Sequence, residues 1–136
     1  MSVDVYLNFN GNCREAVSFY AKVFKTEEPK FMTFGETPPN PEYPMPDEAK
    51  DKIMHTRLNI DGSNVMFSDV FPGMPFVEGN NITIALVNKN IEELTSIFNQ
   101  LKDGGTVVMD LQETFWSKLY GQVTDEFGIH WQVNYE

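Results

Sequence analysis

The chain has 136 residues, 41% of them apolar and 13% aromatic, which suits one domain, or two half-domains sharing one core, and disfavours intrinsic disorder. Twenty Asp and Glu against ten Lys and Arg give a net charge of −10, which disfavours binding to nucleic acids and to anionic membrane surfaces. No apolar run approaches the roughly 20 residues of a membrane span, and the N-terminus lacks a signal-peptide pattern. The single cysteine, Cys13, suits a reducing compartment, so we expect a cytoplasmic protein.

The first half of the chain reads as one strand, one helix and three further strands. Apolar residues alternate at the strand period of two near the N-terminus and then recur at helical spacing. Asp61-Gly62 predicts a hairpin between the last two strands. We expect these elements at residues 4–9, 10–24, 29–35, 52–60 and 64–70. Residues 36–50 are predicted to be a long loop without regular structure, because they carry Pro38, Pro39, Pro41, Pro44 and Pro46.

The second half repeats this order. Its helix, like the first, follows a strand and opens with Asn and an acidic first turn. Gly104-Gly105 ends that helix, and residues 125–128 predict a turn before the last strand. We expect the elements at residues 82–87, 88–101, 106–111, 118–124 and 129–135. The chain is therefore predicted to be a single α+β domain, residues 1–136, made of two βαβββ modules at residues 1–70 and 80–136.

The period of two also sorts the strand faces. One face of each predicted sheet is apolar and should pack against the helices. The other face mixes polar groups with Met, Ala and Tyr, whereas a fully solvated face would carry more Lys and Glu. This mixture is typical of a cavity that holds a small ligand.

Seven phrases, in order along nearly the whole chain, resemble the PhnB-like branch of the vicinal oxygen chelate superfamily, which includes glyoxalase I and bleomycin-resistance proteins. They lie at Tyr6–Asn12, Glu15–Tyr20, Lys52–His55, Gly79–Asn81, Gly104–Val107, Leu111–Trp116 and Asp125–Trp131. The resemblance implies paired βαβββ modules whose sheets curl around a shared cavity, usually in a homodimer. It also implies a divalent metal held by His, Gln or Glu from the first and last strands of each module.

The metal ligands do not carry over to this sequence. Only Gln132, and Asp4 if it takes the first-strand position, offers an oxygen that suits a hard cation, and borderline metals need three or four imidazole or carboxylate ligands. We therefore predict no metal and no cofactor. The corresponding positions are Asp4 or Val5, Met66 with Ser68 next on its face, Thr83, and Gln132. A demethylubiquinone methyltransferase label found in the family lacks support, since no Gly-x-Gly-x-x-Gly follows a strand.

Several residues of the mixed faces are candidates for ligand binding. His55 suits a general base or ligand donor and Arg57 an anion clamp, although both could form a polar seam satisfied by acidic neighbours or by a dimer partner. Trp116 and Tyr120 could stack on a planar ligand or fill the core. The predicted pocket consists of Tyr6, His55, Arg57, Ser68, Thr83, Trp116, Tyr120 and Gln132.

Three functions stay open at this point. The first is a homodimeric protein that binds a small, partly polar molecule without a catalytic metal. The second is a lyase-, isomerase- or dioxygenase-type enzyme, either with an atypical metal set of Asp4, His55 and Gln132 or metal-free through His55; its support is the record of the fold alone. The third is a dimeric scaffold without a ligand.

Overall fold

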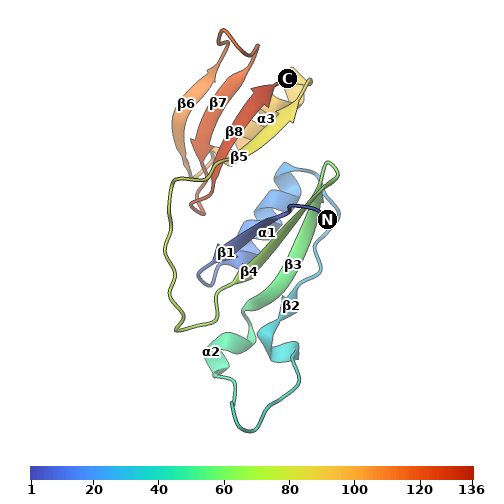
Figure 1. Ribbon diagram of the computed structural model, residues 1–136, viewed down its shortest axis with the longest axis vertical. Helices are drawn as coiled ribbons and strands as arrows, with labels where there is room; N and C mark the ends of the chain where they lie inside the picture. Colours follow the sequence, from blue (N-terminus) through green and yellow to red (C-terminus); the bar gives the residue numbers. More distant parts are fainter. The chain divides into compact units, whose positions relative to one another are not determined.

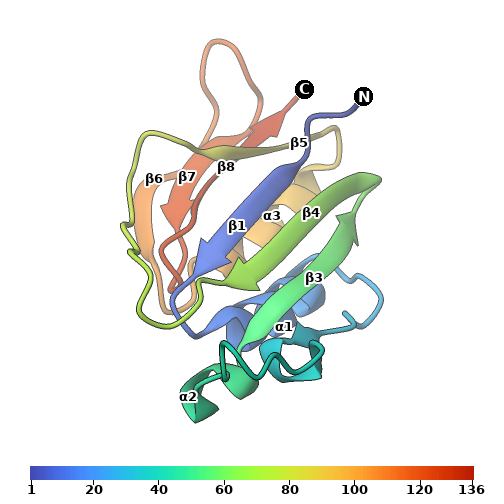
Figure 2. The same ribbon diagram turned by 60° about the horizontal axis from the view of Figure 1, so that its bottom comes forward.

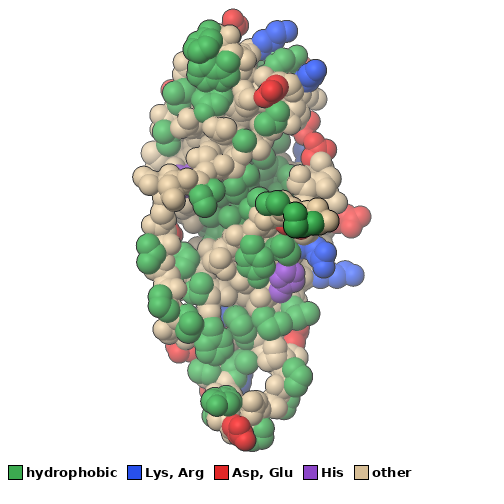
Figure 3. Space-filling view, viewed as in Figure 1, with side chains coloured by type: hydrophobic (Ala, Val, Ile, Leu, Met, Phe, Trp, Pro, Cys, Tyr) green, Lys and Arg blue, Asp and Glu red, His purple; other side chains and the backbone are tan.

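The computed structural model describes all residues, 1–136 (Figure 1). The chain divides into two compact units, Met1–Val77 and Glu78–Glu136, each with its own sheet and helix. No helix is both long and apolar enough to cross a membrane. On the face seen in Figure 3, acidic and basic side chains are scattered singly or in small groups among polar and apolar ones. Charge on that face is therefore dispersed.

The first unit contains one mixed four-stranded sheet. Its elements are β1 (Val5–Phe9), α1 (Cys13–Val23), β2 (Met32–Thr33), β3 (Ile53–Ile60) and β4 (Ser63–Asp69). The strand order is β1-β4-β3-β2, with β1 parallel to β4 and the other pairs antiparallel. A parallel pair needs a crossover, which α1 and the strands after it provide. Figure 2 shows α1 along one face of this sheet.

The second unit has the same topology. Its elements are β5 (Ile84–Asn88), α3 (Ile91–Leu101), β6 (Thr106–Gln112), β7 (Tyr120–Thr124) and β8 (His130–Tyr135). The order β5-β8-β7-β6, with β5 parallel to β8, matches the first sheet strand for strand. The predicted α+β fold of two βαβββ modules is therefore confirmed, and both sheets are open.

Three local predictions differ from the structure. The strand expected at residues 29–35 is only the two-residue β2, because the register shifts between Met32 and Thr33 and a 3-10 turn follows at Phe34–Glu36. The loop expected at 36–50 ends in a one-turn helix, α2 (Asp47–Lys50), which starts directly after Pro46, where a proline leaves the helix ladder intact. The strand expected from residue 82 begins at Ile84, where the ladder with β8 starts.

The predicted turns between the last two strands of each module are present. Asp61 and Gly62 both have positive φ, 51° and 92°, which is the backbone of a tight hairpin that matches strand twist. Gly128 has φ 88° at the end of the turn at residues 125–128. A positive φ favours glycine, so both turns and the strand register after them follow from local sequence.

Each helix buries one apolar stripe against its own sheet. On α1 the buried side chains include Val17 and Tyr20, and the Tyr20 ring lies 5.9 Å from that of Phe67 on β4. On α3 they include Phe98, which packs over Gly121 of β7; a Cβ at Gly121 would lie 2.9 Å from the Phe98 ring. The faces opposite the helices are the mixed faces of the sequence prediction, and they carry the candidate residues.

Candidate functional site

The polar face of the first sheet gathers four predicted site residues. The strand register places Tyr6, Met66 and Arg57 in one row across β1, β4 and β3. His55 lies two residues before Arg57 on the same face, and its Nδ1 is 3.5 Å from the hydroxyl of Tyr6. Ser68 lies beside Met66 along β4, and its hydroxyl donates to Oδ1 of Asn8 at 3.4 Å.

Arg57 on this face has no charge partner within the chain. The only ion pair of the structure joins Lys50 and Asp47, on α2. Arg57 is the only Lys or Arg in β1–β4, and the single carboxylate of these strands, Asp69, is buried and bonded to backbone N–H groups. The acidic neighbours that would satisfy a polar seam are therefore missing from the strands around this guanidinium.

The polar face of the second sheet gathers three other predicted residues. The register places Ala85, Gln132 and Gln122 in one row across β5, β8 and β7. The Tyr120 hydroxyl donates to Gln132 Oε1 at 2.7 Å and accepts from Gln122 Nε2 at 2.8 Å. The Trp116 ring meets Tyr120 edge-on, with ring centroids 5.3 Å apart.

Two residues near this face have other placements. Thr83 is exposed and lies one residue before β5, so the strand neighbour of Gln132 is Ala85. Both ring nitrogens of His130 are engaged, Nδ1 with the Thr124 hydroxyl and Nε2 with the Gly79 carbonyl, each at 2.9 Å. His130 therefore ties β7 and the segment before β5 to β8.

The donor atoms in the two rows that contain the predicted metal positions Met66 and Gln132 do not suit a divalent metal. In the first unit Met66 pairs with Tyr6 and not with the predicted Asp4 or Val5, because Val5 pairs with Val65, and Asp4 lies before β1 and accepts from Asn64 Nδ2. The row on the polar face therefore carries a phenol and a thioether. In the second unit the row carries the methyl of Ala85 and the amide of Gln132, whose oxygen already accepts from Tyr120. No group of three or more His, Cys, Asp or Glu side chains is placed to hold a metal ion. Such a set lacks the carboxylates and imidazoles that these metals require.

Sequence reasoning missed two buried carboxylates that position the site strands. Asp69, at the end of β4, accepts from the backbone N–H groups of Gly11, Cys13 and Ile53. This ties the start of α1 to the strand that carries His55. Asp125, in the turn before β8, accepts from the N–H groups of Phe127 and Ile129 and from the indole of Trp131. The only signal in the sequence is an Asp beside a strand end, which also fits an ordinary turn.

Cys13 has no role in the chemistry of either face. Burial, and then the nearby Asp69 carboxylate, raise the pKa of its thiol to about 12. A thiol in the first helical turn is often acidified by the helix dipole, but here desolvation outweighs that effect. Cys13 is therefore a small core residue.

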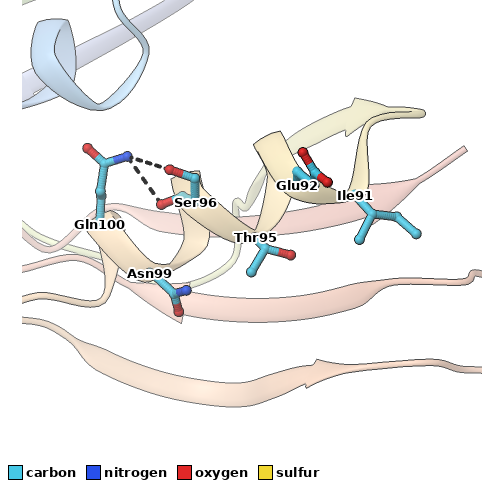
Figure 4. Close-up of a pocket in the computed structure, with 6 residues that line it drawn as sticks. All are labelled: Ile91, Glu92, Thr95, Ser96, Asn99 and Gln100. Atoms are coloured by element: carbon cyan, nitrogen blue, oxygen red, sulfur yellow. Dashed lines mark hydrogen bonds between the residues drawn. The ribbon is translucent and has the colours of Figure 1, made fainter.

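A shallow depression follows the outer side of α3 (Figure 4). Its lining comes from one helix alone, with polar residues beside one isoleucine: Ile91, Glu92, Thr95, Ser96, Asn99 and Gln100. The Gln100 amide donates to the Ser96 carbonyl and hydroxyl, and none of the predicted site residues lies there. This depression offers no imidazole, thiol, cation or aromatic ring, so the polar sheet faces remain the candidate site.

A family model described as 3-demethylubiquinone-9 3-methyltransferase matches residues 2–134. The chain belongs to this PhnB-like family. The YjdN protein of Escherichia coli is 34% identical, over 98% of this chain and 95% of YjdN. The crystal structure of protein PA1353 from Pseudomonas aeruginosa is 38% identical with a TM-score of 0.87, over 100% of this chain and 98% of that chain.

More distant structures show that the PhnB-like chain has the vicinal oxygen chelate fold, as predicted. A putative 3-demethylubiquinone-9 3-methyltransferase, PhnB protein, from Bacillus cereus is 21% identical with a TM-score of 0.77, covering 100% of both chains. A fosfomycin resistance protein, FosX, from Listeria monocytogenes is 12% identical with a TM-score of 0.64, covering 100% of this chain and 93% of that chain. The sheets of this PhnB-like chain are mixed and not doubly wound.

Proposed function

We propose that this PhnB-like protein binds a small, partly polar molecule on the polar faces of its sheets, without a catalytic metal or cofactor. The observation that carries the proposal is Arg57, an unpaired guanidinium beside His55 and Tyr6 in a chain with a net charge of −10. An anionic group of the ligand would supply the missing partner. The metal-free part of the proposal rests on the donor set of Tyr6, Met66, Ala85 and Gln132.

Replacing Arg57 should weaken the binding of small anions. We expect Arg57→Gln to raise the Kd for benzoate by roughly 10- to 150-fold, which corresponds to the roughly 1.5–3 kcal/mol of a charge-assisted hydrogen bond. Benzamide, which has the same shape without the charge, should bind equally to both proteins. Calorimetric titration measures these affinities.

The matched control is Arg14→Gln on α1, because Arg14 is the only other arginine and its guanidinium lies over the Phe31 ring. Equal losses in the two variants would indicate a general charge effect and contradict the assignment of Arg57. Titration after treatment with EDTA should give the same affinity, and a loss of benzoate binding there would overturn the metal-free proposal.

A second candidate function is acid–base catalysis by His55, which the neighbouring Tyr6 hydroxyl favours. Such an enzyme would alter its bound molecule, whereas a binding protein would return it unchanged. The test is whether the ligand is recovered chemically changed. If His55→Gln abolishes that change but still binds the ligand with the same affinity, catalysis by His55 would replace binding as the proposed function.

We also propose a homodimer and a cytoplasmic location. The homodimer is supported by the open sheet edges at β1, β2, β5 and β6, and by the exposed Val108 on β6 and Val87 on β5. Light scattering at micromolar concentration should return twice the chain mass, and a mass near 15.6 kDa would contradict the dimer.

A further inference from the structure

The polar face of the second sheet is built from uncharged hydrogen-bonding groups. Gln122 lies on β7, and Gln132 and Asn134 lie two residues apart on β8, with the Tyr120 hydroxyl beside them. Strands β5, β7 and β8 contain no Asp, Glu, Lys or Arg, whereas β6 contains Asp110 and Glu136 directly follows β8. This face therefore differs from that of the first sheet, where Arg57 stands, and it suits a neutral ligand.

The hydrogen bonds of Tyr120 leave the amide nitrogen of Gln132 and the amide oxygen of Gln122 without a partner. The single hydroxyl proton goes to Gln132 Oε1, so the other bond must come from Gln122 Nε2. The Gln132 Nε2 group then keeps its N–H donors, and Gln122 Oε1 stays an acceptor. Because the two glutamines are direct cross-strand neighbours, their side chains stand next to each other on this face, joined through the Tyr120 hydroxyl.

Asn134 adds a second acceptor on the same face. Its Nδ2 donates to Glu136 Oε2 at 3.2 Å, which fixes the orientation of the amide. Its Oδ1 is buried and has no hydrogen-bond partner. Buried polar atoms nearly always have a partner, and an unpaired one costs free energy.

An aromatic wall stands next to these amides. Trp116 is 55% exposed and meets Tyr120 edge-on, with the ring planes at 72°. Phe115, which is 98% exposed, contacts Trp116 in the same edge-on manner. Exposed aromatic rings beside a polar face offer a surface on which a flat ring can stack.

We infer that this face binds a planar, uncharged heterocycle through a cis-amide edge, that of a lactam or an imide. The ring carbonyl would accept from Gln132 Nε2, the ring N–H would donate to Gln122 Oε1, and Trp116 would cover the ring. An anion is disfavoured, because Gln122 Oε1 and the Glu136 carboxylate beside Asn134 would repel it. This inference rests on the proposed binding function and names the ligand class for the second unit.

Calorimetric titration with uracil and with 1,3-dimethyluracil tests the inference. The two rings share their shape and carbonyl groups, but methylation removes both N–H donors. We expect uracil to bind at least tenfold more tightly than its dimethyl derivative. Trp116→Ala should weaken both compounds by a similar factor, because stacking does not depend on the N–H groups.

The Gln132→Glu variant isolates the donor. A carboxylate can still accept from the Tyr120 hydroxyl, but it has no N–H for the ring carbonyl, so uracil should bind at least tenfold more weakly. Gln100→Glu on α3 is the matched control and should leave the affinity unchanged. Thermal melting verifies that the variants fold. If Gln132→Glu unfolds, Tyr120→Phe replaces it, because it removes the hydroxyl that orients both glutamines. Uracil should then bind Tyr120→Phe at least tenfold more weakly.

Equal affinity for the two compounds, or an unchanged affinity for uracil in the variant that folds, would overturn the inference. Arg57-dependent binding of benzoate without any binding of uracil would also overturn it, while leaving the proposed function in place. Failure of both uracil and benzoate to bind at millimolar concentration would count against both proposals.

Discussion

Asp69→Ala should lower the free energy of unfolding by about 3–5 kcal/mol. The carboxylate is only 3% exposed and accepts from the backbone N–H groups of Gly11, Cys13 and Ile53 at 2.9–3.0 Å. Alanine leaves three donors without a partner, and each buried unsatisfied group costs roughly 1–3 kcal/mol. Urea denaturation followed by circular dichroism measures the loss.

The control for this variant is Asp110→Ala on β6, where the side chain is exposed and makes no hydrogen bond. Its free energy of unfolding should change by less than about 0.5 kcal/mol. The loss of unfolding free energy in Asp69→Asn should lie between those of Asp69→Ala and Asp110→Ala. The asparagine amide keeps one acceptor oxygen but replaces the other oxygen with a donor that faces backbone N–H groups. A loss below about 1 kcal/mol in Asp69→Ala would contradict the anchoring role of this carboxylate.

Asp125→Ala should have the second largest effect, a loss of about 2–4 kcal/mol. Asp125 Oδ1 accepts from the N–H groups of Phe127 and Ile129, and Oδ2 accepts from the buried indole N–H of Trp131 at 2.8 Å. The variant leaves that indole donor buried and loosens the turn that sets the start of β8. In a Trp116→Phe background Trp131 is the only tryptophan, so a red shift of the tryptophan emission would report entry of water.

A double-mutant cycle with Trp131→Phe separates the indole bond from the turn. Phenylalanine removes the N–H donor, so Asp125→Ala should cost less in this background than in the native chain, by about 1–2 kcal/mol. Strictly additive losses would mean that the bond between Asp125 and Trp131 contributes nothing. In that case the turn alone would account for the effect of Asp125→Ala.

The order of elements was predictable because it depends on local signals. Each of these signals spans only a few neighbouring residues. They are the alternation in β1, the left-handed Asp61-Gly62 turn, and the apolar stripes of α1 and α3. The short β2 was not predictable, since it depends on a bulge against β3 and on the bond from the Phe34 N–H to the Lys52 carbonyl. Contacts between distant residues override local pattern there.

The candidate site was predictable only in part, for a similar reason. The period of two correctly placed His55 and Arg57 on the polar face of the first sheet. The turn before β8 correctly placed Gln132 on the polar face of the second sheet. The direction of the hydrogen bonds through Tyr120, and with it the free donor on Gln132, requires coordinates. Asp69 was missed because its partners at Gly11 and Cys13 lie 58 and 56 residues away in the sequence.

The buried thiol makes Cys13 a built-in reporter of local opening. A thiol-alkylating reagent reacts with the thiolate. In the folded first unit burial keeps the reagent from Cys13, and the pKa of about 12 keeps its thiol protonated at neutral pH. Labelling must therefore wait until the first turn of α1 detaches from Asp69. Because the chain has a single cysteine, the alkylation rate at fixed pH counts these openings in the first unit alone, without any engineered probe.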